Sequence, residues 1–208
     1  MNRVLYLLCI LSSFLIASCK VNTQKEDKSA LIIEKFTLNH YSKNGSKLYM
    51  IETPFSVFNQ TDNSYLLNKT NIKFFEKDNV KYNVNSDSAK LLNNKFLELK
   101  GNVEINDFNN NKTIIKSNNL FWDIDKSEFI LEGDVSLVNN VINIISNKAL
   151  IDNKKDIILF YNPVKYYYKE EDSIREYNIS SENAYYNIKT RNVIFKSNND
   201  KVKSKLFF

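Results

Sequence analysis

The sequence has few of the residues on which many kinds of functional site depend. Of its 208 residues, three are glycine, two are proline, two are cysteine and one is histidine. No two glycines lie close enough together to form a glycine-rich phosphate-binding loop, which excludes the common nucleotide-binding motifs. A single histidine rules out a His-rich metal site and leaves little material for a catalytic triad. The composition therefore favours a binding protein, with no enzymatic activity, metal or cofactor.

Arginine is also scarce, because only Arg3, Arg175 and Arg191 occur among 29 basic residues. Nucleic-acid-binding proteins rely on arginine forks and on clustered basic faces. Here the lysines are spread along the chain and mixed with acidic residues, and the formal net charge is only +5. The sequence thus indicates no nucleic-acid partner. A modest preference for an anionic ligand stays open.

The first nineteen residues predict a bacterial lipoprotein signal. Arg3 precedes an apolar run from Val4 to Ile16, and the run ends in Ala17-Ser18-Cys19. A basic start, a short apolar core and small residues at its end are typical of a secretory signal peptide. The small-small-Cys ending resembles a lipobox. We therefore expect a signal peptide over residues 1–18, a lipidated Cys19, and a polar tether over residues 19–30. The alternatives are an uncleaved anchor or an incidental cysteine.

Residues 31–208 show short segments of alternating apolar and polar residues, and no helical stripe. A period of two predicts half-buried β-strands. Asparagines such as Asn93-Asn94, Asn109–Asn111 and Asn139-Asn140 stand where tight turns need positive φ angles. The apolar residues of three neighbouring segments share one parity and are expected to face the interior. They are Leu97, Leu99, Val103, Ile105, Trp122, Phe129, Leu131, Val135 and Leu137.

A Ser-x-x-Ala/Leu motif recurs along this region and indicates an internal repeat. It begins at Ser86, Ser117, Ser146 and Ser181, at intervals of 31, 29 and 35 residues. We interpret it as a turn between strands, in about five copies of a unit of two to three strands that stack around one interior. Two copies continue through Gly101-Asn-Val and Gly133-Asp-Val. A glycine inside a strand marks a bend in the sheet or leaves room for a ligand.

These repeats, together with the segment from Phe36 to Ile51, resemble the LptC proteins of lipopolysaccharide export and, more loosely, the LptA/OstA family. The resemblance implies an all-β domain over residues 31–208, an open β-jelly-roll with an apolar trough. It implies that lipid A acyl chains lie in that trough, so the nine inward residues become the walls of a lipid-binding groove. A filled core is the alternative, and the sequence does not separate the two. Lys47, Lys81 and Lys165 are candidates for contacting lipid A phosphates.

The resemblance also implies partners and a location. The protein would be a lipid-anchored relay on the periplasmic side of the inner membrane, driven by an ABC transporter. The N-terminal edge (Ile32 to Leu38) would face that transporter, and the C-terminal edge (Glu176 to Lys196) would face an LptA-like bridge. We assign no family counterpart to the tail after Ala184, and the expected lipidation of Cys19 would replace the usual transmembrane helix. The alternative is a structural or adhesive β-repeat lipoprotein with a filled core.

Overall fold

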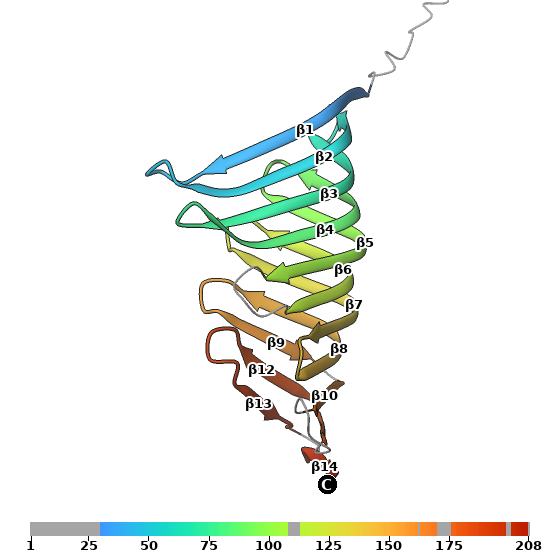
Figure 1. The fold of residues 1–208 in the computed structure, drawn as a ribbon. Helices are drawn as coiled ribbons and strands as arrows, with labels where there is room; N and C mark the ends of the chain where they lie inside the picture. The colour runs from blue at the N-terminus through green and yellow to red at the C-terminus, as the bar shows by residue number, and fades with distance from the viewer. Residues whose placement is uncertain (1–29, 108–112, 162, 170–175, 199–200, 208) are drawn as a thin grey trace, which may run out of the picture.

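The computed structural model describes residues 30–107, 113–161, 163–169, 176–198 and 201–207. All regular secondary structure in these ranges is β-strand, and fourteen strands form one antiparallel sheet (Figure 1). The strands are β1 (Leu31–Tyr41), β2 (Lys47–Asn59), β3 (Ser64–Glu76), β4 (Asn79–Leu92), β5 (Phe96–Asp107), β6 (Ile114–Asp123), β7 (Glu128–Val138), β8 (Ile142–Asp152), β9 (Ile157–Tyr161), β10 (Val164–Lys169), β11 (Glu176–Ser181), β12 (Asn183–Asn187), β13 (Val193–Lys196) and β14 (Lys203–Phe207).

The sheet is a meander that divides into two branches at its C-terminal end. Each strand from β1 to β8 pairs with the next one along the chain. One half of β8 then pairs with β10, which leads to β11 and β14, and the other half pairs with β9, which leads to β12 and β13. Figure 1 shows the strands stacked along one axis, from blue β1 to red β14. The predicted all-β fold with an open antiparallel sheet is confirmed.

The central strands bend at their midpoints, which folds the sheet into two facing layers. The pairing register shifts between Asn85 and Ser88, and equivalent shifts occur in β5, β6 and β7. Such shifts are β-bulges, which bend a strand and turn a sheet through a corner. We call the layer that ends in β9, β12 and β13 half-sheet I, and the layer that ends in β10, β11 and β14 half-sheet II.

The repeated serine lies at this corner. The hydroxyls of Ser86, Ser117 and Ser146 each donate to the carbonyl two residues further on, at 3.1, 3.0 and 3.0 Å. These bonds satisfy carbonyl groups where the ladder is interrupted, as buried polar groups require. The prediction of a turn between strands is therefore wrong for these three copies, because the motif lies inside β4, β6 and β8. Only the copy at Ser181 falls between two strands, β11 and β12.

Gly101 and Gly133 complete the corner. Their φ angles are +75° and +78°, and each is followed by a residue that also has a positive φ. A Cβ atom on Gly101 would lie 2.6 Å from Oδ2 of Asp87, and one on Gly133 would lie 2.9 Å from Nδ2 of Asn118. The space beside both glycines is thus occupied by polar side chains of the neighbouring strand. The structure favours the bend over the alternative of room left for a ligand.

Substituting alanine for Gly101 is expected to lower the free energy of unfolding by about 2–3 kcal/mol, because the change adds a steric overlap to an unfavourable φ. Gly45 is the matched control, since its φ is +86° and nothing lies within 4 Å of an added Cβ. Gly45→Ala should lower the free energy of unfolding by only about 1 kcal/mol. Urea denaturation of the two variants compares them, and equal losses would show that the contact with Asp87 contributes nothing.

The core lies between the two half-sheets and is rich in aromatic side chains. Trp122 and Phe129 of half-sheet I contact Phe74 of half-sheet II, with ring centroids 4.8 and 5.4 Å apart. Tyr49 and Tyr82 extend this cluster, at 4.8 Å from Trp122 and 6.2 Å from Phe129. Edge-to-face geometry predominates, which is a favourable arrangement for aromatic pairs. The two layers therefore pack directly against each other along the middle of the molecule.

The sheet has edges at both ends. β1 forms the N-terminal edge, as predicted, and Leu31 and Ile32 are exposed on it. The predicted C-terminal edge (Glu176 to Lys196) is correct for β13 but wrong for β11, because β11 is covered by β14. Among the described strands, the edges at that end are β13 and β14. Residues 203–207 of the tail left unassigned after Ala184 thus extend half-sheet II.

Candidate functional site

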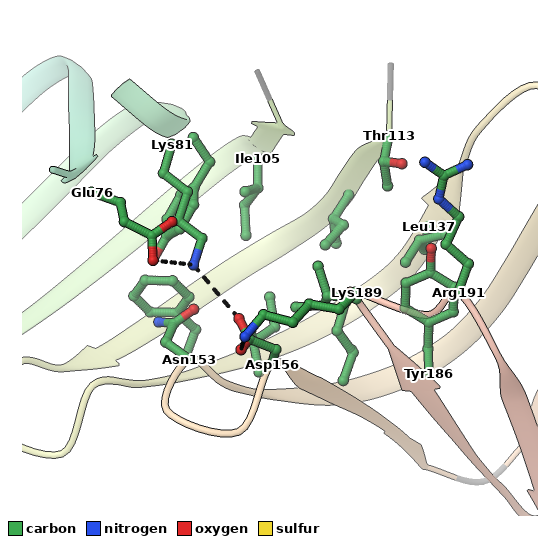
Figure 2. Close-up of a pocket in the computed structure, with 16 residues that line it drawn as sticks. Glu76, Lys81, Ile105, Thr113, Leu137, Asn153, Asp156, Tyr186, Lys189 and Arg191 are labelled. Atoms are coloured by element: carbon green, nitrogen blue, oxygen red, sulfur yellow. Dashed lines mark ion pairs between the residues drawn. The ribbon is translucent and has the colours of Figure 1, made fainter. Parts of the chain in front are cut away.

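A cavity of about 290 Å³ lies between the half-sheets, on the side opposite the corner (Figure 2). It is where the strand ends and turns of the two layers approach each other. Its volume is at the lower end of the range of about 300–1,000 Å³ that is typical of small-molecule sites. The lining residues are Glu76, Lys81, Tyr82, Ile105, Thr113, Ile115, Phe129, Leu137, Ile151, Asn153, Asp156, Ile158, Tyr186, Ile188, Lys189 and Arg191.

The inner wall of the cavity is apolar. Ile105, Ile115 and Leu137 come from half-sheet II, and Phe129 and Ile158 come from half-sheet I. All five belong to the buried core, so the cavity is continuous with the interior that the alternating strand pattern creates. Apolar surface of this kind holds hydrocarbon groups by excluding water, at about 25 cal/mol for each Å² buried. The wall itself is therefore suited to an apolar ligand.

Charged side chains line the mouth of the cavity. The ammonium group of Lys81, in half-sheet II, lies 3.5 Å from a carboxylate oxygen of Asp156, in half-sheet I, and 3.8 Å from Glu76. Lys189 lies 2.6 Å from the other oxygen of Asp156. The four side chains form a chain across the opening, drawn with dashed lines in Figure 2. Lys81–Asp156 is the only ion pair among the described residues that joins the two half-sheets.

These contacts shift the pKa values of the charged groups. The hydrogen bond from Lys189, helped by the charge of Lys81, holds the pKa of Asp156 below its usual value, although burial opposes this shift. The same pairing raises the pKa of Lys189. Beneath the mouth, burial raises the pKa of the Tyr82 hydroxyl well above its usual value. Asp156 and Lys189 are thus both charged, and Tyr82 neutral, at physiological pH.

Two turns carry the mouth residues that belong to half-sheet I. Asp156 ends the turn between β8 and β9, and its carbonyl accepts a hydrogen bond of 2.9 Å from the Ile188 amide. Lys189 and Arg191 lie on the turn between β12 and β13, where the side chain of Asn187 accepts from the Lys189 amide at 3.0 Å. The Arg191 amide donates to the Asn187 carbonyl at 2.8 Å, and Arg191 has a φ of +60°. The β12–β13 turn therefore has a defined conformation tied to its neighbour.

The nine predicted groove residues all face the interior, which confirms their predicted direction, but the structure separates them into two groups. Ile105, Phe129 and Leu137 line the cavity. The other six lie in closely packed parts of the core, each at most 3% exposed. These six are Leu97, Leu99, Val103, Trp122, Leu131 and Val135. Their role in holding lipid stays a prediction.

The structure also separates the candidate lysines. Lys81 lies at the mouth, whereas Lys47 packs over the rings of Tyr41 and Phe75, with its ammonium group 5.9 and 5.2 Å from their centroids. Lys165 is exposed on β10 and lines no part of the cavity. The predicted signal peptide, Cys19, the tether and Asn109–Asn111 lie outside the described residues.

Sequence reasoning missed Asp156, Tyr186, Lys189 and Arg191. No spacing rule links Lys81 to residues that are 75 or more positions away, and the connection exists only because the sheet folds over. Within the described ranges no group of His, Cys, Asp or Glu residues is arranged to hold a metal ion. In the same part of the chain, no helix has the length and hydropathy needed to cross a membrane.

The strand topology and the buried core define an open β-jelly-roll with an apolar interior. The family described as "Lipopolysaccharide-assembly, LptC-related" matches residues 4–144, and the chain belongs to this family. This membership gives the chain a role in lipopolysaccharide assembly.

A search of solved structures finds similarity to LptH from Pseudomonas aeruginosa, described as the LptA-homologous periplasmic component of the lipopolysaccharide transport device. The two chains are 11% identical, and the match covers 60% of this chain and 92% of LptH with a TM-score of 0.47. Among curated proteins the chain has no match.

Proposed function

We propose that the protein is a lipid-anchored relay that accepts the acyl chains of lipopolysaccharide from an inner-membrane ABC transporter and passes them to a following jelly-roll. The single observation that carries this proposal is the apolar cavity between the half-sheets, which is continuous with the core. Each methylene group that enters such a space contributes about 0.8 kcal/mol. A few buried methylene groups therefore give useful affinity for an acyl chain. Such binding is non-covalent.

Entry of a longer acyl chain requires the half-sheets to separate. The cavity accounts for only part of the predicted groove, because six of the nine groove residues are packed in the closed core. Beyond the cavity, apolar contacts such as those of Trp122 with Phe74 hold the two layers together. Hydrocarbon from a ligand can replace such contacts at little net cost, since one apolar surface is exchanged for another. The closed form would be the state without lipid.

The edges of the sheet provide for transfer between proteins. An edge strand has unpaired backbone groups that can add a strand from a partner. We assign β1 to the transporter, because the predicted anchor at Cys19 precedes it, and β13 and β14 to the following jelly-roll. With no nucleotide-binding motif in the sequence, the energy for transfer would come from the transporter's ATPase.

The tight packing of those six residues also favours a second candidate, a structural or adhesive lipoprotein with a filled core. The two candidates differ in what the purified domain, residues 20–208, binds. A relay should bind an environment-sensitive apolar dye, and lipopolysaccharide should displace that dye. A filled scaffold should bind neither.

Placing a photo-crosslinking amino acid at Ile188 tests the relay in cells. Ile188 is half-buried and lines the cavity, so a bound acyl lipid would lie within reach of the probe. We expect a lipopolysaccharide adduct after irradiation, detected by gel shift and by an antibody against lipopolysaccharide. Leu66 is the control position, because it is 49% exposed and lies outside the cavity. An adduct of equal strength at both positions, or at neither, would contradict the proposal.

A further inference from the structure

The mouth of the cavity carries more positively than negatively charged side chains. Lys81, Lys189 and Arg191 lie around the opening with only two carboxylates, those of Glu76 and Asp156. The carboxylates pair with the two lysines. Among the described residues Arg191 makes no ion pair, and it is exposed beside the cavity. The rim therefore has one positive charge in excess, and that charge is on the residue best suited to bind an anion.

The local structure holds Arg191 at this position. The Asn187 side chain accepts hydrogen bonds from the amides of Lys189 and Thr190, at 3.0 and 2.8 Å, and the Asn187 carbonyl accepts from the Arg191 amide. The left-handed conformation of Arg191 ends the turn. Figure 2 shows Arg191 and Thr113 on one side of the opening and the ion-pair chain on the other. An anion between them could reach a guanidinium, an ammonium and a hydroxyl group.

The chemistry of these groups selects a phosphate. Arginine presents N–H groups in a planar fork that matches two oxygens of a phosphate, and lysine adds a compact positive charge. The ammonium group of Lys189 uses one of its three hydrogens on Asp156, which leaves the others available. Directly below, the wall is apolar at Ile158 and Leu137. A ligand with a phosphate joined to an acyl chain would satisfy both parts at once.

We propose that Arg191 and Lys189, on the β12–β13 turn, form a phosphate-binding site that reads the headgroup of an acyl lipid whose chain enters the cavity. The proposal rests on the proposed function, and it names which part of the lipid is recognised. Both residues lie beyond residues 4–144, the span that the family description matches. The phosphate can belong to lipid A or to a glycerophospholipid.

The test uses the full chain in cells, with the photo-crosslinker at Ile188. Combining Lys189→Gln with Arg191→Gln should reduce the adduct about three- to tenfold, because charge-assisted hydrogen bonds at an exposed rim are lost. Lys100→Gln combined with Lys148→Gln is the matched control. Like Lys189, these lysines pair with carboxylates, but they lie on the outer face of half-sheet I. The single substitution Arg191→Lys should give an adduct between that of the double variant and that of the unaltered chain, since lysine keeps the positive charge but lacks the planar fork of the guanidinium group.

A second arm identifies the source of the phosphate. In cells that express a lipid A phosphatase, the adduct with the unaltered chain should fall to the level of the double variant. If mass spectrometry instead identifies a glycerophospholipid adduct whose amount falls in the double variant, the site recognises the phosphate of that lipid. An undiminished adduct in the double variant would overturn the phosphate site and leave the relay standing. No adduct with the unaltered chain would overturn both.

Discussion

Replacing Phe129 with alanine is expected to lower the free energy of unfolding by about 3–5 kcal/mol, the largest stability effect of any single substitution considered. Phe129 is 1% exposed and contacts rings from both half-sheets, among them Trp122 at 5.7 Å and Phe74 at 5.4 Å. Truncation would remove apolar surface and leave a void where the layers meet. Trp122 is the only tryptophan, so its fluorescence reports unfolding at this place.

Phe121 provides the control for this prediction. It lies on β6 next to Trp122 but points to the outer face, where it is 38% exposed. Among the rings of the described residues it stacks only on Phe96, at 5.7 Å. Phe121→Ala should cost less than about 1 kcal/mol, as surface substitutions usually do. If both substitutions had the same cost, the packing between half-sheets would not be the main source of stability.

Ending the chain before Glu176 is expected to abolish co-purification with the following jelly-roll while membrane attachment persists. The cut removes β11 to β14, and with them both described edges at the C-terminal end. Backbone pairing with a partner strand would then have no template. Affinity purification from membranes, with the partner detected by mass spectrometry, measures the result. Unchanged recovery of the partner would contradict the assignment of this edge.

A shorter deletion separates loss of the edge from loss of the fold. Of the described strands, removing residues 199–208 takes away only β14, whose side chains Lys203, Ser204 and Lys205 are exposed. The buried residues Ala184 and Tyr186 remain, so the core stays intact. This variant should resist proteolysis like the full chain and should recover the partner less well. Full recovery of the partner would show that lipid passes to the following jelly-roll at the β13 edge instead.

The strand pattern could be read from the sequence because it depends on local rules. Alternation of apolar and polar residues fixes which side chains face inward, and the nine residues from Leu97 to Leu137 are all buried. Asn93 and Asn94 have φ angles of +51° and +55°, as a tight asparagine turn requires. The sequence shows the repeat at Ser86 but predicts a turn between strands where the structure has a bend within a strand, because the two features use the same residues.

The candidate site could be predicted only in part. Ile105, Phe129 and Leu137 follow from inward parity, but parity cannot tell a residue beside a cavity from one in a filled core. The charged mouth depends on a contact between β4 and the turn before β9, brought about by the fold of the sheet. Lys81 was one of three lysines that the sequence could not rank. Asp156 and Arg191 carried no signal, since charged residues in turns are common.

By itself, the sequence determined that this is an all-β repeat protein with an apolar interior, because side-chain alternation acts through neighbouring residues of one strand. It also determined the family, through the order of the repeats. Only the tertiary structure decided how much of that interior is open and which charged side chains line the mouth of its cavity. Both depend on how closely two layers approach across the fold, and that distance is set by the packing of residues far apart in the chain.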